Sequence, residues 1–445
     1  MEAVLGRPLD ESCAEAITQA ANAGLAEFSQ LDWKGELYDH GSEGRSELAK
    51  DVCALANHLG GAIIIGVEED AQGKPTGATG VVVDEGELLW MRAVVSAWTS
   101  PFPFYDLIIA PIEGTDRAFV LILVPPSPGA PHALVKPGQK RLLYPVRDGS
   151  QTRYLGEPEI ASGYRQRFLG LDDRRRRLVS ITEEGLAHMG EQLLLLSLSL
   201  VPLVPGRGSV DQRSIREMDD WFGDRTSRIG LFGEHSLSGL RVEPGLDRFV
   251  VASRDSADSD AEQRALYAYG ELHTDGSGVV VRRILQAQEG GSEEPDRSAF
   301  ILFDEELTAR VVDMLDLLVY FAVERSGASG PVEARLALST NGDHQIRLTT
   351  IGGGERWGRV QRLGRRDIAL PLAVDRTLDL TAMHEAVGNL LLSARLLAQA
   401  VVQAAGFPEL RQIDGEGRIR KRHVDARVLE FAARHGVGTT EEGVG

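Results

Sequence analysis

The segment from Ala54 to Asp70, ALANHLGGAIIIGVEED, constrains the fold more than any other part of this chain. A helical pattern over residues 46–58 ends at Gly60-Gly61, a pair that permits a tight reversal with positive φ. The short aliphatic run at 62–67 is typical of a strand that is buried on both faces. Glu68, Glu69 and Asp70 follow it directly. Carboxylates at the end of a buried strand are rigidly held yet reach solvent, an arrangement that favours metal binding or acid–base chemistry.

Residues on either side complete a longer pattern. Glu27 precedes Asp32 by five positions, and Asp32 leads directly into Trp33-Lys34. Downstream come VLILVPPS at 120–127, Pro131-His132, and YPVRDGSQT at 144–152. Residues 56–61, ANHLGG, form an ANxxGG motif. Together with this motif, the residues above resemble the Schlafen AlbA-type domain family over about residues 20–165. The resemblance implies an α/β module that acts on nucleic acid, with a mixed sheet and flanking helices.

The resemblance also implies a candidate active site. Glu27, Asp32 and Glu69 match the three acids of nuclease-active Schlafens, which implies that they are catalytic and bind Mg²⁺ or Mn²⁺. Lys34 would then lie beside the scissile phosphate. The match departs from the family at two positions, because Asp32 stands where Glu is typical and Glu69 where Asp is typical. The alternative is that these acids lie on the solvated surface of an inactive binding module.

Charge is distributed unevenly along the chain. The formal net charge is −18, which opposes nucleic-acid binding overall. Residues 136–177 are an exception, with eleven Lys or Arg against five acids. We expect phosphate contacts from Lys136, Lys140, Arg141, Arg147 and Arg153 in this segment. The alternative interpretation of the segment is a solvated, charged helix and linker.

Three functional hypotheses follow. The leading one is a metal-dependent endoribonuclease that cleaves structured RNA such as tRNA, with RNA preferred over DNA as the partner. The second is a non-catalytic DNA-binding or transcriptional regulator whose C-terminal half senses a ligand or partner. The third is a structural or assembly protein that uses the same fold. ATP binding is not supported, since the chain lacks a GxxxxGK[ST] loop and Gly352-Gly353-Gly354 is not followed by lysine and a hydroxyl residue.

The chain is long enough for more than one domain. We expect an N-terminal helix at 1–25, the AlbA-type domain at 26–170, an α+β domain of unknown role at 180–425, and a disordered tail at 436–445. The start lacks the pattern of a signal peptide, and the longest apolar run, 193–204, is too short to span a bilayer. We therefore expect a cytoplasmic protein with no membrane partner.

Several elements of the C-terminal half are predicted from local patterns. A helix over 181–194 would have Thr182 as its cap. Strands at 334–338 and 345–351 would pair as a hairpin across Asn341-Gly342. Residues 253–263 and 288–297 are predicted to be mobile loops.

The resemblance also implies an assembly, because active Schlafen cores resemble two AlbA-type lobes that face each other across a groove, and only one lobe is recognisable in this sequence. It therefore implies a homodimer, unless residues 180–380 form a diverged second lobe. The apolar helices at 305–325 and 381–405 are either the subunit contact or ordinary core.

Overall fold

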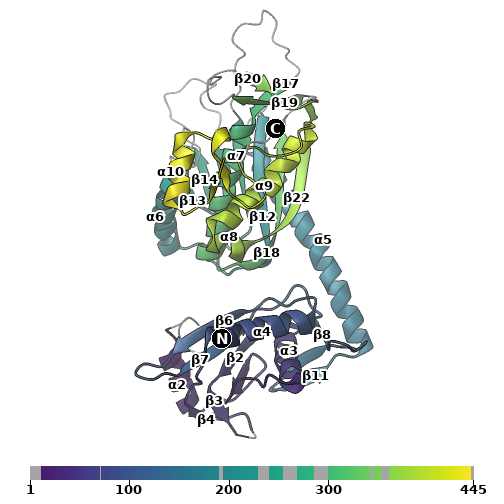
Figure 1. Cartoon of the computed structure of the whole chain (residues 1–445), viewed down its shortest axis with the longest axis vertical. Coiled ribbons are helices and arrows are strands. Elements are labelled where there is room, and N and C mark those ends of the chain that lie inside the picture. The colour runs from purple at the N-terminus through teal and green to yellow at the C-terminus, as the bar shows by residue number, and fades with distance from the viewer. Residues whose placement is uncertain are drawn as a thin grey trace, which may run out of the picture. The chain divides into compact units, whose positions relative to one another are not determined.

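The computed structural model describes residues 12–70, 72–189, 194–228, 240–253, 268–284, 299–340, 344–351 and 360–441. The chain forms two compact units, Met1–Asp172 and Asp173–Gly445. Figure 1 shows the first unit in purple to blue and the second in teal to yellow, each with its own sheets. The boundary between the units falls within the long helix α5 (Glu157–Ala187).

The N-terminal unit is built on a mixed four-stranded sheet in the order β1-β2-β7-β6. Its strands are β1 (Leu31–Lys34), β2 (Gly61–Ile65), β7 (Ala118–Val124) and β6 (Asp106–Pro111). β1 and β2 are parallel, and the other two pairings are antiparallel. The mixed sheet with flanking helices confirms the predicted fold class of this unit.

Strand β2 is buried on both faces, as its unbroken aliphatic run predicts. Ile63 and Ile65 pack against α3 (Ser42–Ala56) and α4 (Glu85–Trp98), whereas Ile64 packs with Ile17 of α2 (Ala14–Asn22) on the opposite face. This alternation is the ordinary period of a strand. Two helices therefore cover one face of the sheet, and one covers the other.

The predicted strand 62–67 is interrupted at Gly66. This glycine has φ 105°, and a Cβ there would lie 2.6 Å from the Cα of Gly80, so only glycine is accommodated without strain. The chain turns and continues as β3 (Val67–Glu69), which pairs with β4 (Pro75–Ala78). The turn thus carries the acids that follow β2 onto a separate hairpin.

The remaining strands of this unit form two small sheets. One has the order β5-β8-β9, from Thr99–Ser100, Ala133–Val135 and Leu142–Leu143. The other is the hairpin of β10 (Pro145–Asp148) and β11 (Gln151–Tyr154). β10 lies against α3 and brings the YPVRDGSQT motif next to the main sheet.

The C-terminal unit is an α+β domain around an antiparallel seven-stranded sheet in the order β13-β14-β15-β16-β12-β18-β22. The strands in that order are Leu240–Gly245, Arg248–Ser253, Ala268–His273, Gly278–Ile284, Leu194–Val204, Ser329–Ser339 and Leu372–Asp379. α7 (Asp304–Tyr320), α8 (Leu380–Glu385) and α9 (Val387–Ala404) share one large core with this sheet, and α6 (Gln212–Arg228) packs beside β13. The end of α5 covers the other face through Leu178, Ile181 and Leu186.

A smaller sheet and the C-terminal elements complete this unit. Parallel strands β17 (Ala299–Phe303) and β19 (Gln345–Ile351) are joined by β20 (Val360–Arg362) and β21 (Ile368–Ala369). A π-helical turn, Phe321–Arg325, extends α7. After α9 come β23 (Ile419–Arg420), a 3₁₀ turn Lys421–His423, α10 (Ala426–Arg434) and β24 (Thr439–Thr440).

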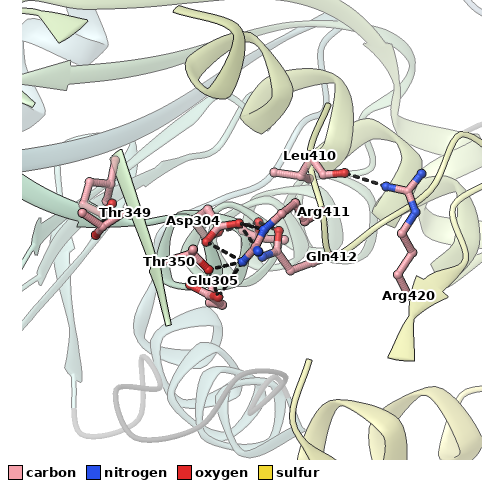
Figure 2. A network of polar contacts seen from close by, with 10 residues as sticks. Asp304, Glu305, Thr349, Thr350, Leu410, Arg411, Gln412 and Arg420 are labelled. Carbon is pink, nitrogen blue, oxygen red and sulfur yellow. Dashed lines mark hydrogen bonds and ion pairs between the residues drawn. The ribbon is translucent and has the colours of Figure 1, made fainter. Parts of the chain in front are cut away.

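A buried polar network holds the segment after α9 to the start of α7. Asp304 Oδ2 accepts hydrogen bonds from Arg411 Nε at 2.8 Å and from Gln412 Nε2 at 2.9 Å. Glu305 Oε1 accepts from Arg411 Nη2 at 3.0 Å and from Thr350 Oγ1 at 2.7 Å. Figure 2 shows the Arg411 guanidinium pointing between the two carboxyl groups. The network therefore joins α7, β19 and the chain after α9.

Three predictions for the second half are wrong. Helix 181–194 is instead the end of α5, where buried Thr182 donates to the Leu178 carbonyl rather than capping a terminus. No proline interrupts the chain between residues 159 and 187, and the arginine-rich stretch favours helix. The predicted helix 381–405 is broken at Ala386, whose backbone is extended. The tail predicted to be disordered from 436 contains β24, which pairs with β23.

The hairpin across Asn341-Gly342 is also wrong. Both edges of β18 are occupied, by β12 and β22, so β19 pairs elsewhere, with β17. Asn341-Gly342, Gly352-Gly353-Gly354, the loop at 288–297 and nearly all of the loop at 253–263 lie outside the described residues.

The two apolar helices belong to the core of the C-terminal unit. Thirteen of the residues of α7 are buried, which agrees with the ordinary-core alternative for this helix. Within the described residues, Val387–Ala404 is the one helix that is long and apolar enough to cross a membrane by length and composition. Its Leu390, Leu397 and Val401 are buried in the large core, as in the core helix of a globular domain.

Candidate active site in the N-terminal unit

Strand β1 places two charged residues of the predicted site side by side. Leu31 and Trp33 point into the core under α2, so Asp32 and Lys34 point to the opposite face. Lys34 Nζ lies 2.9 Å from Asp32 Oδ2, and the two side chains are 25% and 5% exposed. The alternation of β1 therefore holds a lysine against a buried aspartate.

Arg147, on β10, is the second partner of Asp32. Its Nη1 donates to Asp32 Oδ1 at 2.8 Å, and its side chain is 4% exposed. Burial alone would raise the pKa of Asp32, but the charges of Lys34 and Arg147 outweigh burial and lower it. Arg147 was predicted to contact nucleic acid. Its guanidinium is instead buried against Asp32, which makes it a residue that positions the site.

Glu27 is held just before β1 by the backbone. Its Oε1 accepts a hydrogen bond from the Trp33 amide at 2.8 Å, and its own amide donates to the Gly73 carbonyl. The pKa of Glu27 is raised to about 8, first by burial and then by the negative charges of Asp32 and Glu69. Burial and the neighbouring negative charges thus act on this carboxyl in the same direction.

Glu69, at the end of β3, completes the group. Its pKa is raised by burial and by Asp32, against the lowering effect of Lys34, and its carboxyl lies within hydrogen-bonding reach of Glu27. Asp32 and Glu69 are thus both close enough to Glu27 for their charges to act on it, and the catalytic and metal-binding roles of the three acids stay a prediction. Glu69, like Glu68 before it, is exposed to solvent.

Asp51 and Tyr38 are members of the site that the sequence analysis missed. Asp51 lies on α3 and is 4% exposed; its Oδ2 accepts from Tyr38 Oη at 3.0 Å, and its Oδ1 is 3.3 Å from Lys50 Nζ. Burial and the charge of Asp32 raise the pKa of Asp51 to about 6. Burial would lower the pKa of Lys34, but Asp32, Asp51 and Glu27 raise it. The available signal was an acid within the apolar helix pattern LAKDVCALA.

The donor atoms of this group suit a hard divalent cation, because Mg²⁺ and Mn²⁺ prefer carboxylate oxygens. A cation would also relieve the repulsion that raises the pKa of Glu27. Asp32, however, is already neutralised by Lys34 and Arg147. Within the described part of the chain, no set of three or more His, Cys, Asp or Glu side chains is arranged to hold a metal ion. The carboxylate oxygens of Glu27 and Glu69 are therefore suitable ligands for such a cation. That Asp32 is also a ligand stays a prediction.

The other predicted basic residues have different surroundings. Arg153 is exposed but forms a double hydrogen bond with Glu159, at 3.0 and 2.7 Å, and lies 3.4 Å from Asp148. Lys136 Nζ lies 6.0 Å from the centre of the Trp98 ring. Lys140 and Arg141 are exposed.

The ANxxGG motif has a structural role at Asn57. Its Nδ2 donates to the carbonyls of His132 and Pro145, both at 2.8 Å, and its Oδ1 accepts from the His132 amide at 2.6 Å. His132 itself is buried, with its ring nitrogens against Pro101 O and Ser127 Oγ, and burial lowers its pKa to about 4. Asn57 therefore fixes the loop that leads into β10 and Arg147.

Residues 27–155 match the family model described as Schlafen, AlbA_2. These residues form a Schlafen AlbA-type domain. The match ends before α5, and the C-terminal unit has no assignment. The predicted family is thus confirmed for the part of the chain on which the prediction was made.

The solved structures that are similar to the chain include the following two. One is the crystal structure of the DIP2311 protein from Corynebacterium diphtheriae, with 18% identity and a TM-score of 0.23; it covers 47% of this chain, which spans 33% of that protein. The other is the solution structure of the N-terminal domain of a RecG-related protein from Nitrosomonas europaea, with 15% identity and a TM-score of 0.24, over 34% of this chain and 96% of that domain. No curated protein matches. The Schlafen AlbA-type family suggests a function related to nucleic acid.

Proposed function

We propose that the Schlafen AlbA-type domain is a metal-dependent endoribonuclease that cleaves structured RNA such as tRNA. The observation that carries the proposal is that Glu27 is half-buried next to the carboxyl groups of Asp32 and Glu69, so that burial first and then their charges raise its pKa to about 8. Acidic side chains that the fold holds close together repel one another and reduce its stability. Such arrangements are concentrated at functional sites. Lys34, which is a quarter exposed, supplies positive charge at the same place.

In this proposal Glu27 and Glu69 would hold Mg²⁺ or Mn²⁺, and Asp32 would complete the ligand set. When bound, the cation supplies activated water and charge stabilisation for phosphodiester cleavage. The residues of the chain do the remaining work. Lys34 binds the phosphate as a point charge, Arg147 fixes the carboxylate of Asp32, and Asp51 balances the charge of Lys34 from α3.

The test is cleavage of labelled tRNA and of DNA by the full-length protein, with and without Mn²⁺. Wild type should cleave tRNA only with the metal, and Glu27→Gln and Glu69→Gln should each lose most of that activity. Glu68→Gln is the matched control, because Glu68 is adjacent in sequence and exposed like Glu69, whereas Glu69 is the acid whose charge acts on Glu27. Equal activity in all three variants would remove these acids from the mechanism.

The second candidate is a non-catalytic nucleic-acid-binding regulator. One observation favours it, since both carboxylate oxygens of Asp32 are already paired with a cation, Oδ2 with Lys34 and Oδ1 with Arg147. Binding of tRNA or duplex DNA by wild type, with no cleavage under any metal condition and unchanged binding by Glu27→Gln, would support this candidate over the nuclease.

A homodimer is part of the nuclease proposal. Among the described residues, one sheet belongs to the AlbA-type domain, and the large sheet of the C-terminal unit is antiparallel throughout. A groove between two AlbA-type lobes therefore needs a second copy of the chain. Light scattering tests this, and a monomer at all concentrations would favour the regulator.

A further inference from the structure

The hairpin between β8 and β9 is exposed along its whole turn. Every residue from Pro137 to Leu143 is exposed. The turn is nonetheless well defined, because the Gln139 amide donates to the Lys136 carbonyl at 3.0 Å and Gly138 has φ 80°. Proline followed by glycine at these positions is typical of a type II turn. The hairpin is therefore an ordered projection of the AlbA-type domain.

Two positive charges on this hairpin have no acidic partner. Within the described part of the chain, Lys140 and Arg141 form no recorded ion pair, whereas Lys34, Arg147 and Arg153 each do. No acid occurs anywhere between residues 127 and 147. In a chain with a net charge of −18, this is a local positive surface that a polyanion can reach.

Two leucines beside these charges are also exposed. Leu142 is 57% exposed and Leu143 is 38% exposed, and the two form β9, the edge strand of its small sheet. Burial of a leucine side chain stabilises a protein by about 1.5–3 kcal/mol, so the fold gains little from these two as they stand. An apolar pair next to free cations is the composition of a nucleic-acid wedge, in which the cations contact phosphates and the apolar side chain packs between bases.

We propose that residues 136–143, the β8–β9 hairpin, bind nucleic acid, with Lys140 and Arg141 on phosphates and Leu142 against an unstacked base. The inference rests on the proposed nucleic-acid function and adds its contact surface and a preference for unpaired or distorted strands. An anionic membrane is a poorer occupant, because polybasic membrane sites use clusters of about four to eight cations. A second copy is also poorer, since a two-residue edge strand offers few backbone hydrogen bonds.

Fluorescence anisotropy on the full-length protein tests the inference, with labelled oligouridine, an RNA duplex and tRNA over a range of salt. Leu142→Ser/Leu143→Ser should weaken binding of the single strand about 5- to 20-fold and leave the salt dependence unchanged, since base stacking contributes about 1–3 kcal/mol per base. Its matched control is Leu246→Ser, a leucine that is 85% exposed in the other unit. Leu142→Ser/Leu143→Ser should weaken binding of the RNA duplex less than binding of the single strand.

A second experiment tests the two cations with the variant Lys140→Gln/Arg141→Gln. This variant should bind the RNA probes more weakly and reduce the slope of log K against log salt by about 1 to 2. Arg165→Gln/Arg175→Gln is its control, because it removes two exposed charges of the same basic segment from α5. Control and test pairs with equal effects would overturn the hairpin as a specific contact.

The outcomes separate the two proposals. If wild type binds none of the probes, the proposed function itself fails. If wild type binds and both hairpin variants behave like their controls, the hairpin inference fails and the function stands. Loss of phosphatidylserine-vesicle binding, or of a dimer in light scattering, in Leu142→Ser/Leu143→Ser with unchanged RNA binding would assign the hairpin to another occupant and overturn the inference.

Discussion

Arg147 donates a hydrogen bond to Asp32 across 115 residues of sequence, and both side chains are almost completely buried. The pair joins the β10–β11 hairpin to the first strand of the main sheet. Because Asp32 also contacts Lys34, the same interaction that fixes the hairpin sets the charge of the candidate active site. Structure and site therefore depend on one ion pair.

Arg147→Met should destabilise the AlbA-type domain by about 3–5 kcal/mol, because it leaves the buried Asp32 carboxylate with a single partner. Urea unfolding measures this. Arg153→Met is the control, since Arg153 forms an exposed pair and should change stability by about 1 kcal/mol or less. The double variant Arg147→Met/Asp32→Asn should recover part of the loss. Equal unfolding midpoints for Arg147→Met and wild type would show that the pair does not hold the hairpin.

Glu27→Gln should stabilise the protein at pH 7 by roughly 1 kcal/mol while removing metal-dependent activity. Glu27 is ionised in the unfolded chain at pH 7, whereas burial and the charges of Asp32 and Glu69 raise its folded-state pKa to about 8, so folding must add a proton to it. Glutamine needs no such proton and can still accept from the Trp33 amide. The unfolding midpoint and tRNA cleavage are measured on the same preparation. A destabilised variant would mean that Glu27 is a structural acid.

The sequence predicted the AlbA-type domain because its signals are local. The helix, the two glycines and the aliphatic strand each follow from a few adjacent residues, and Glu27, Asp32 and Glu69 could be placed by the family motif. Arg147 and Asp51 were misplaced or missed, since charged residues are mostly exposed and their burial depends on partners distant in sequence. The partner of β19 likewise depends on tertiary structure. The strands that pair with β18 on its two sides, β12 and β22, come from outside the local segment, so β19 does not pair with β18.

Asn57→Ala should destabilise the domain by about 2–4 kcal/mol. The substitution removes three hydrogen bonds and leaves the backbone of His132 and the carbonyl of Pro145 without these partners. Asn389→Ala is the control, because Asn389 makes one exposed bond to the Ala382 carbonyl. Thermal unfolding of both variants gives the comparison. If Asn57→Ala and Asn389→Ala both lowered the unfolding temperature by the same small amount, the structural role assigned to Asn57 would be wrong.

Asp304→Asn and Glu305→Gln, neighbours in the network of Figure 2, should have opposite effects. Asp304→Asn leaves Arg411 without its main charge partner and should lower stability by about 3–5 kcal/mol. Burial and the charge of Asp304 raise the pKa of Glu305 to about 8, so its side chain is largely neutral at pH 7. Glu305→Gln should therefore leave stability unchanged or increase it, with the gain growing as pH rises from about 4.5 to 8. Urea unfolding at several pH values measures the stability of both variants. A similar loss of stability in Asp304→Asn and Glu305→Gln would contradict the assigned charge states.

Acidification should weaken the C-terminal unit through Glu271. This carboxylate is 1% exposed, accepts from Tyr269 Oη at 2.7 Å, and lies 3.2 Å from Arg248 Nη1 and 3.4 Å from His273 Nε2. Burial alone would raise its pKa, but His273, Tyr269 and Arg248 lower it to about 2.

A folded-state pKa below the ordinary value of 4.5 means that Glu271 stabilises the folded state above pH 4.5 and loses that effect as pH falls toward 2. The stability difference between wild type and Glu271→Gln should thus be largest near pH 7 and shrink steadily below pH 4.5. Unfolding by urea across this range tests it, with exposed Glu243→Gln as the control that should show no such trend. A difference that stayed constant down to pH 3 would mean that the cluster holds Glu271 by packing and not by charge.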